Sequence, residues 1–355
     1  MSLTDTTGSA RGNSAGVDWA KDDYAVCVVD VDGEPLERYG SAGNKDDRFD
    51  AYVLADTVRT DRRRLTPLVL DSPDTTALRK LRRARKDLVA HRVAVANQLR
   101  AHLATALPAA VDLFRDIDST ISLRFLTRFT TQNAMDWLSP KRLAAWLSSV
   151  GYSGRTDPTV LHTRITAAPR GATDDHGQAL AGITRAYLTT LQAITTQIDA
   201  PTQQTSEALT LHPDRDIFTN LPKTGTVRAA RLLAEIRDAR GRFPTPDSLA
   251  CLAGVAPSTR QSGKVTVVAF RWAVDKQLRD AVGDFAGDSR HANPWAADPY
   301  NRARARGCDH PHAVRILARA WPNIIWKCWT TNTPYNPDRH GALQHLPNQD
   351  QPAAA

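Results

Sequence analysis

The chain has 355 residues, is 41% hydrophobic and carries a formal net charge of +8. This length predicts two or three domains with a real core, and the charge favours an anionic partner. The four cysteines are far apart and form no CxxC pair, which argues against a disulfide framework and a zinc site and fits a reducing, cytoplasmic compartment. No apolar run reaches membrane-spanning length. The polar residues 1–15 predict a disordered tail without a signal peptide.

A strand hairpin is predicted next. Residues 24–31, YAVCVVDV, are rich in β-branched side chains and are typical of a buried strand. The dipeptide Asp32-Gly33 is typical of a hairpin turn, so residues 35–39 are predicted to form an edge strand that runs back along the first strand. Asp18 stands just before the buried strand, where its carboxylate could hold a metal ion or could simply be a cap or a solvated turn residue.

A helix is predicted over residues 44–61, with acidic residues near its start. Asp47 and Asp50 are three residues apart, so both carboxylates lie on one helix face. Two such carboxylates, with a third from a strand, can hold a hard divalent ion through oxygen. The alternative is a solvated acidic face without a ligand.

A long basic helix begins at Ser72-Pro73-Asp74, which combines a cap, a first-turn proline and a first-turn acid. It should run to Leu107. One stripe of this helix is apolar near heptad spacing, and the other faces carry basic residues that include Arg82, Arg83 and Lys86. It is either a coiled-coil arm that dimerises and lays arginines along nucleic acid, or a packed helix with a solvated basic face.

Residues 109–211 look all-helical. Within them, a helix over 178–198, extending toward 211, is a candidate antiparallel partner of the long basic helix.

The stretch from 218 to 264 reads as turn, helix, turn, helix and polar loop. The turn at 221–225 precedes a helix, and backbone amides at a helix N-terminus form a phosphate-binding device, here beside Lys223 and Arg228. Thr245 is predicted to cap the second helix. In the polar loop over 257–264, a hydroxyl between basic neighbours suits contact with a phosphate, although it could also be an ordinary loop serine at a glycine turn. These residues are Arg260, Ser262 and Lys264.

After this loop, an apolar run over 265–270 is a possible strand. Three helices are predicted to follow: one over 272–290, one that contains Tyr300 and ends at Gly307, and one over 312–329. Four tryptophans in this part favour core positions over base-stacking platforms. They are Trp295, Trp321, Trp326 and Trp329.

Two blocks carry a resemblance to a known family. Residues 45–56, KDDRFDAYVLAD, and the SGK at 262–264 resemble bacterial insertion-sequence transposases that pair an acidic RuvC-like N-terminal domain with a C-terminal serine, the group that includes the Piv-type DNA invertases. The closing helices over 287–321 are also similar. The resemblance implies a mainly α fold with a small α/β part: a truncated RNase H-like piece, a helical coiled-coil arm, and a helical C-terminal domain with a helix-hairpin-helix-like element.

The same resemblance implies the chemistry. Asp18, Asp47 and Asp50 match acids that hold Mg²⁺, and Ser262 matches the nucleophile that forms a phosphoserine–DNA intermediate and makes strand exchange reversible. DNA and a guide-like bridge RNA are the implied partners, and the protein is expected to be a homodimer or tetramer with no membrane association.

Two departures from the family limit this interpretation. Relatives have more strands and a second acid, a glutamate, between the first acid and the KDDRFDAYVLAD block, whereas here little more than a hairpin separates Asp18 from Asp47. Lys223 stands where the family pattern has glycine. The alternatives are therefore a catalytically inactive nucleic-acid-binding remnant, and a junction nuclease that uses only the acids. Domain boundaries are predicted at 1–15 (tail), 16–64 (truncated RuvC/RNase H-like), 65–215 (helical and coiled-coil), 216–332 (C-terminal transposase domain) and 333–355 (disordered tail).

Overall fold

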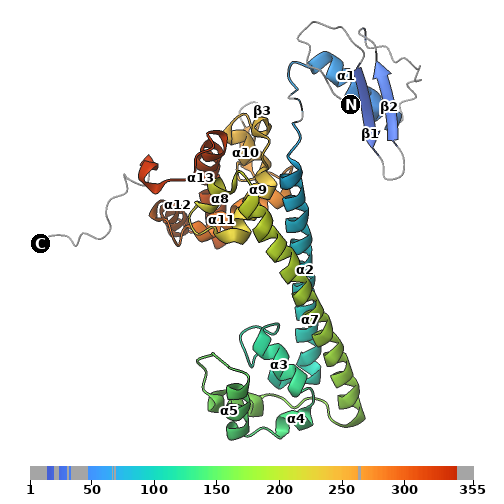
Figure 1. The fold of residues 1–355 in the computed structure, drawn as a ribbon, viewed down its shortest axis with the longest axis vertical. Helices are drawn as coiled ribbons and strands as arrows, with labels where there is room; N and C mark the ends of the chain where they lie inside the picture. Colours follow the sequence, from blue (N-terminus) through green and yellow to red (C-terminus); the bar gives the residue numbers. More distant parts are fainter. Residues whose placement is uncertain are drawn as a thin grey trace, which may run out of the picture. The chain divides into compact units, whose positions relative to one another are not determined.

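The structure is a computed structural model that describes residues 14–19, 24–29, 32, 47–65, 67, 69–262 and 265–341. The chain divides into two compact units, residues 1–69 and 70–355. Helices predominate in the described part, which confirms the predicted mainly α class (Figure 1). No helix within these ranges is long and apolar enough to cross a membrane.

The first unit contains a strand hairpin with a helix lying on it. Strand β2 (Tyr24–Val29) forms where a strand was predicted, and it pairs antiparallel with a preceding strand, β1 (Ser14–Trp19), that was not predicted as its partner; Gly16 lies opposite Cys27. Helix α1 (Asp47–Asp61) contacts both strands. A Cβ on Gly16 would lie 2.0 Å from the carbonyl oxygen of Ala51, so only glycine lets α1 approach β1 this closely.

Only one face of this hairpin is covered by described residues. Cys27 and Val29 are buried against α1 together with Ala51, whereas Val17 and Val26 on the opposite face are exposed. A two-stranded sheet gains stability mainly from such packing. The predicted edge strand over 35–39 lies outside the described residues, and the RNase H-like assignment stays a prediction.

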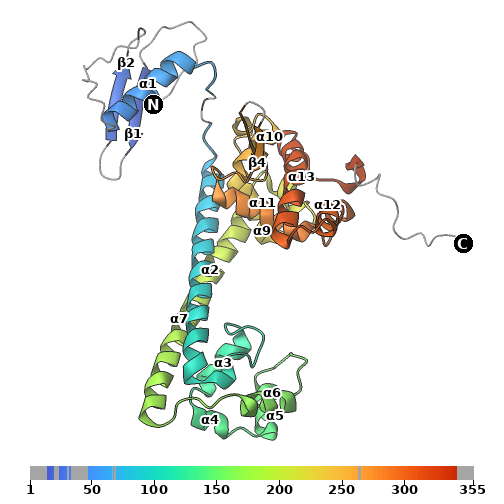
Figure 2. The same ribbon diagram turned by 180° about the vertical axis from the view of Figure 1, so that it is seen from behind.

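The second unit is built on two long antiparallel helices, α2 (Pro73–Ala106) and α7 (Asp174–Leu211) (Figures 1 and 2). Their hydrogen bonds run in opposite chain order: Thr75 to His212, Arg85 to Thr202, and His102 to Thr184. The predicted start of α2 is confirmed, because the Ser72 hydroxyl accepts a hydrogen bond from the Thr75 amide. The predicted antiparallel partner is also found.

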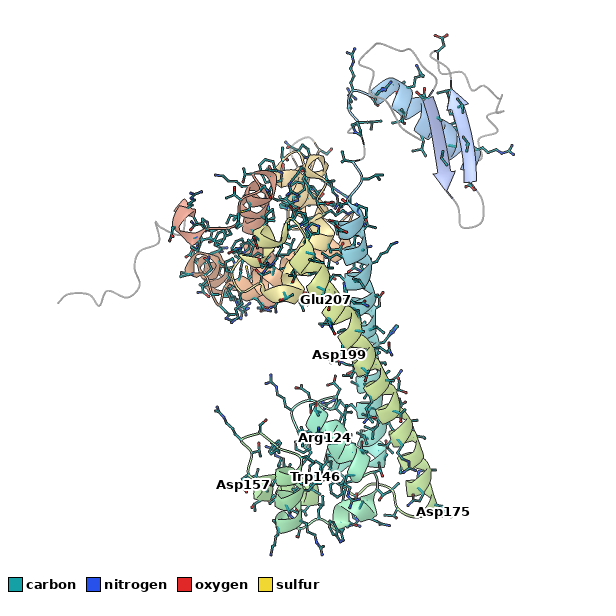
Figure 3. The ribbon with its side chains drawn as sticks, in the orientation of Figure 1. Arg124, Trp146, Asp157, Asp175, Asp199 and Glu207 are labelled. Atoms are coloured by element: carbon teal, nitrogen blue, oxygen red, sulfur yellow. The ribbon has the colours of Figure 1, made fainter. Side chains whose placement is uncertain are left out.

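The apolar stripe of α2 is used within the chain. Leu99 and Leu103 share one core with Leu188 and Leu191 of α7. Dimerisation through a coiled coil therefore stays a prediction. Polar and acidic side chains such as Asp175, Asp199 and Glu207 are spread along α7 (Figure 3).

Small helices pack against one end of the α2–α7 pair. They are the 3₁₀ turn η1 (Pro108–Ala110), α3 (Thr120–Arg128), α4 (Gln132–Asp136), α5 (Pro140–Ser149) and α6 (Pro158–Ala167). Phe125 anchors their core, with its ring 4.9 Å from that of Phe129 and 5.3 Å from that of Trp146.

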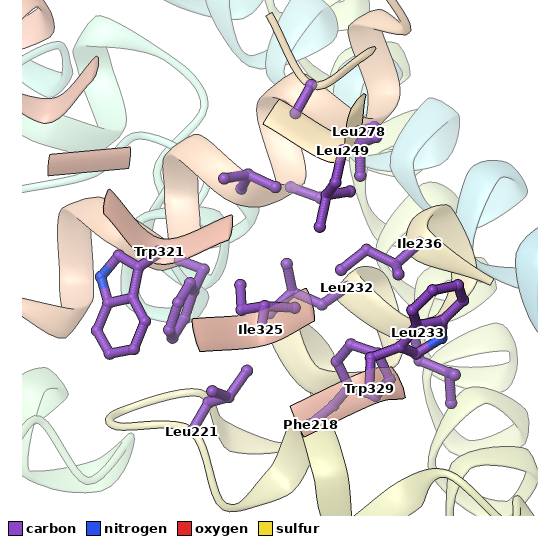
Figure 4. Close-up of a cluster of buried hydrophobic side chains, with 14 of the residues drawn as sticks. Phe218, Leu221, Leu232, Leu233, Ile236, Leu249, Leu278, Trp321, Ile325 and Trp329 are labelled. Carbon is purple, nitrogen blue, oxygen red and sulfur yellow. The ribbon is translucent and has the colours of Figure 1, made fainter. Parts of the chain in front are cut away.

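A second helical cluster packs against the opposite end of the pair, where its core includes Leu78 and Leu209. Figure 4 shows part of this core, with Trp321 and Trp329 among the labelled side chains. The helices of this cluster are α8 (Arg215–Thr219), α9 (Gly225–Ile236), η2 (Arg240–Arg242), α10 (Pro246–Leu252), α11 (Lys276–Ser289), α12 (Pro294–Ala305) and α13 (His310–Thr330). Trp321 and Trp329 are fully buried, which confirms them as core residues.

The predicted tail boundaries need correction. The chain remains packed beyond residue 333: Tyr335 is buried, its hydroxyl accepts a hydrogen bond from the Asn293 side chain at 3.0 Å, and the turn η3 (Pro337–Arg339) follows. Strand β1 likewise begins at Ser14, inside the predicted N-terminal tail. The aromatic ring of Tyr335 explains the first difference, because it packs edge-on against Trp321.

Candidate functional site

Residues 258–262 of the predicted polar loop over 257–264 form a strand in the structure, which corrects that prediction. Strand β3 (Ser258–Ser262) pairs antiparallel with β4 (Val265–Ala269), and we call residues 258–269 the serine hairpin. The possible strand over 265–270 is confirmed. Ser262 lies opposite Val265, so a two-residue connection joins the strands. The polar composition of this stretch alone did not reveal the strand pairing.

Ser262 lies at the end of β3, beside the connection, and is exposed. Within the described residues its hydroxyl makes no hydrogen bond. Arg260, two residues earlier on the same strand, lies opposite Val267, and alternate strand residues share a face. The hydroxyl and the guanidinium therefore project on the same side of the serine hairpin. Lys264 lies outside the described residues.

The serine hairpin packs little against the rest of its unit. Val268 of β4 is 64% exposed, and Val265 and Val267 are exposed as well. Its base is fixed by Arg271, whose Nε donates to the carbonyl of Ala256 at 3.3 Å. A mostly uncovered two-stranded hairpin is marginal by itself, which is consistent with a surface that meets a ligand.

An exposed tryptophan next to this hairpin was missed in the sequence. Trp272 is 82% exposed, and its ring lies edge-on to Phe270 at 4.9 Å. Two arginines, Arg279 and Arg315, lie over the Phe270 ring. The sequence did contain a signal: Phe270 and Trp272 directly follow a strand and are separated by Arg271. This spacing does not match the pattern of a buried helix face.

The predicted turn before α9 is present, with helix α8 in front of it. Lys223 has φ = 58° and Gly225 has φ = 60°, a left-handed conformation that favours glycine. The Thr224 hydroxyl donates to the carbonyl of Leu221, so α9 begins without a side-chain cap. Lys223 is exposed, and Arg228 forms an ion pair with Asp288. Classification of this turn as a helix-hairpin-helix stays a prediction.

Three of the basic residues of α2, which are Arg82, Arg83 and Lys86, do not form the predicted free surface, because α9 and α11 pack beside them. Arg82 is only 5% exposed, which corrects its assignment to an exposed basic face. Arg83 donates two hydrogen bonds to Glu235 of α9, and Lys86 lies 2.8 Å from Asp280 of α11. Their predicted contact with nucleic acid stays a prediction, and these intramolecular partners compete with it.

Burial also changes the electrostatics of this region. Burial, together with the neighbouring charges of Arg85 and Arg231, lowers the pKa of Arg82 to about 10, although the charge of Glu235 opposes the shift. Burial likewise lowers the pKa of Arg242 to about 10. By contrast, hydrogen bonding to Glu235 raises the pKa of Arg83.

The predicted metal-binding acids lie in the first unit. Asp47 and Asp50 occupy the first turn of α1, and Asp18 lies on the face of β1 that carries Gly16, by strand alternation. The described residues contain no group of three His, Cys, Asp or Glu side chains placed to hold a metal ion. Carboxylate oxygens suit Mg²⁺, but the arrangement described does not fit a three-carboxylate site.

Comparison with known proteins adds independent information. The family described as "Transposase IS116/IS110/IS902 family" matches residues 215–301, and a transposase family named for the DEDD domain of IS110 matches residues 36–108. The first match contains Ser262. The second contains Asp47 and Asp50 but begins after Asp18.

Full-length relatives are similar as well. The "Mini-circle putative transposase for IS117" of Streptomyces coelicolor is 31% identical over 314 residues, which cover 85% of this chain and 75% of the relative. An uncharacterized 42 kDa protein of insertion element IS900 from Mycobacterium paratuberculosis is 30% identical over 295 residues, covering 82% and 73%. An uncharacterized 44.8 kDa protein of IS116 from Streptomyces clavuligerus is 29% identical over 304 residues, covering 84% and 75%.

Proposed function

Because the chain belongs to the IS116/IS110/IS902 family of insertion-sequence transposases, we propose that it cuts and rejoins DNA through the hydroxyl of Ser262. The observation that carries this proposal is the exposed position of Ser262 at the end of β3, with Arg260 on the same face. A nucleophile must reach a phosphorus atom inside a bulky duplex, and an arginine beside it can bind a phosphate oxygen.

The proposed step is a transesterification. The Ser262 oxygen attacks the phosphorus of a DNA phosphodiester and forms a serine–phosphate ester, while one phosphorus–oxygen bond of the DNA backbone breaks. The serine proton leaves to solvent or a base, and the departing deoxyribose oxygen gains a proton. Because one phosphate ester replaces another, a DNA hydroxyl can reverse the step and release serine, which rejoins strands without an external energy source.

The further parts of the proposal rest on family resemblance. They are a guide-like bridge RNA that selects the target, assembly as a homodimer or tetramer, and Mg²⁺ held by carboxylates that include Asp47 and Asp50. Since the described carboxylates do not form a three-ligand group, no step of the reaction is assigned to the metal here.

The test is trapping of a covalent protein–DNA adduct. The full chain is incubated with supercoiled plasmid, labelled duplex, Mg²⁺ and the element's RNA, then denatured and resolved by electrophoresis. An adduct is expected with the wild type and not with Ser262→Ala. Ser258→Ala is the matched control, because it removes a hydroxyl from the same strand of the serine hairpin. An adduct that persists in Ser262→Ala would contradict the proposal.

A second candidate is a nucleic-acid-binding remnant without catalysis. The short stretch of sequence between Asp18 and Asp47, where relatives have further strands and a second acid, favours it. It predicts equal DNA binding by the wild type and Ser262→Ala, with no adduct from either. The adduct assay therefore separates the two candidates directly.

A further inference from the structure

A basic pocket lies in the second unit between α2, α9 and α11. Its volume is about 600 Å³, and it lies beside the first turn of α9 rather than at the serine hairpin. Five basic side chains and one carboxylate line it: Arg82, Arg85, Lys86, Arg228, Arg231 and Asp284. A pocket of this size is large enough for a nucleotide-sized group.

Most of the basic residues in this pocket already have partners. Lys86 lies against Asp280, Arg228 against Asp288, and Arg231 against Asp284. Arg85 donates from its Nε to the hydroxyl of Thr202. These contacts hold the side chains in place around the pocket.

Arg82 is the exception. Its side chain is 5% exposed, and its Nε and Nη1 atoms are buried without a hydrogen-bond partner. Arg85 and Arg231 repel its charge and Glu235 attracts it, but no described residue accepts a hydrogen bond from its Nε or Nη1. A buried guanidinium without a partner is costly, and such a group is retained where an anion completes its hydrogen bonds.

The start of α9 supplies a second set of unused donors to the same pocket. The amides of Gly225 and Thr226 belong to the first turn, which has no side-chain cap because the Thr224 hydroxyl donates to Leu221 instead. Gly225 has open space where a Cβ would be, so a ligand can approach the backbone. Uncapped amides and the helix dipole favour a negatively charged group at this position.

We propose that this pocket binds one phosphate of a nucleic-acid backbone, with the buried guanidinium of Arg82 and the first amides of α9 as its donors. A planar guanidinium matches two phosphate oxygens. This inference rests on the proposed function for the identity of the ligand, but the pocket itself stands on the unpaired Arg82 and the uncapped helix. The contact would fix the position of DNA or RNA on the unit without taking part in bond cleavage.

The first test uses inorganic phosphate and thermal unfolding of the full chain. Sodium phosphate should raise the unfolding temperature of the wild type above that in sodium chloride of equal ionic strength, and should not do so for Arg82→Met. In chloride, Arg82→Met should unfold at the same temperature or higher, because it removes an unpaired buried charge. Lys80→Met is the matched control, since Lys80 is an exposed cation on the same helix. A phosphate effect retained in Arg82→Met, or a lower unfolding temperature of that variant in chloride, overturns the proposal.

The second test identifies the source of the phosphate. Binding of a labelled DNA duplex should weaken about tenfold in Arg82→Met, and the slope of log affinity against log salt should fall by about 0.9, as for one lost phosphate contact. An unchanged slope and affinity would show that the pocket takes free phosphate and would refute the backbone source. Neither test depends on the Ser262 adduct, so the failure of one proposal is distinguishable from failure of the other.

Discussion

Arg83 of α2 and Glu235 of α9 form a two-pronged ion pair that docks the C-terminal helices onto the long helix pair. The Nε and Nη2 atoms of Arg83 donate to the two carboxylate oxygens of Glu235 at 3.1 and 2.8 Å. The Glu235 side chain is 4% exposed, and Arg79 lies 3.7 Å away as a second cation. A single buried carboxylate therefore balances two arginines.

We expect Glu235→Gln to lower the free energy of unfolding by about 2 kcal/mol, because both arginines lose their counter-charge. The value lies below that of a fully buried pair since the Arg83 side chain is 36% exposed and can be hydrated. Urea unfolding measures the change. Glu207→Gln, on the exposed surface of α7 (Figure 3), should change stability by no more than about 0.5 kcal/mol. Equal effects of the two substitutions would show that the ion pair does not stabilise the fold.

The left-handed conformation of Lys223 predicts that glycine is preferred at this position. Lys223→Gly should raise the free energy of unfolding by about 0.5–1 kcal/mol, since relief of backbone strain outweighs the added freedom of the unfolded chain. Gly225→Ala, with the same sign of φ, should lower it by about 1–2 kcal/mol. Thermal or urea unfolding measures both. A loss of stability in Lys223→Gly would mean that the lysine side chain makes a stabilising contact. Weaker DNA binding by the same variant would support the predicted role of Lys223 in binding nucleic acid.

Asp238 makes the docking of α2 sensitive to acid. Burial alone would raise the pKa of Asp238, but hydrogen bonds from Ser72 and Thr75 outweigh it and lower the pKa below 3.8. The folded state therefore favours the carboxylate, whose stabilisation is complete above pH 3.8 and is lost as the pH falls through the lowered folded value. The difference in unfolding free energy between the wild type and Asp238→Asn, about 1 kcal/mol at neutral pH, should shrink below pH 3.8. A difference that is constant with pH would contradict this assignment.

The acids of α1 can be tested separately from the serine. Asp47→Asn should abolish adduct formation or require more Mg²⁺ for it, if the predicted metal role is correct, while helix content changes little because a first-turn acid stabilises a helix by only about 0.3–1 kcal/mol. Asp61→Asn, at the opposite end of α1, is the control. Strand cleavage that survives Ser262→Ala but is lost in Asp47→Asn would indicate an acid-only nuclease. Adduct formation at normal Mg²⁺ in Asp47→Asn would end its assignment as a ligand.

The sequence by itself determined the local structure at the points where short-range chemistry is decisive. The caps at Ser72 and Thr245, the strand that begins at Tyr24 and the turn before α9 all form where the residues predict, although described residues bury only one face of that strand. These features depend on neighbours within a few positions, so a single chain segment contains the required information. The family blocks around Asp47 and Ser262 were likewise visible in the sequence alone.

Only the tertiary structure decided which basic residues are available. Arg82 and Arg83 belong to the same run of arginines and look equivalent in the sequence, yet one is buried without a partner and the other pairs with a residue 152 positions away. Helical periodicity separates an apolar stripe from its flanks, but it does not show which flank a distant helix will cover. The burial of charge on α2 depends on the docking of α9, and that contact exists only in the folded chain.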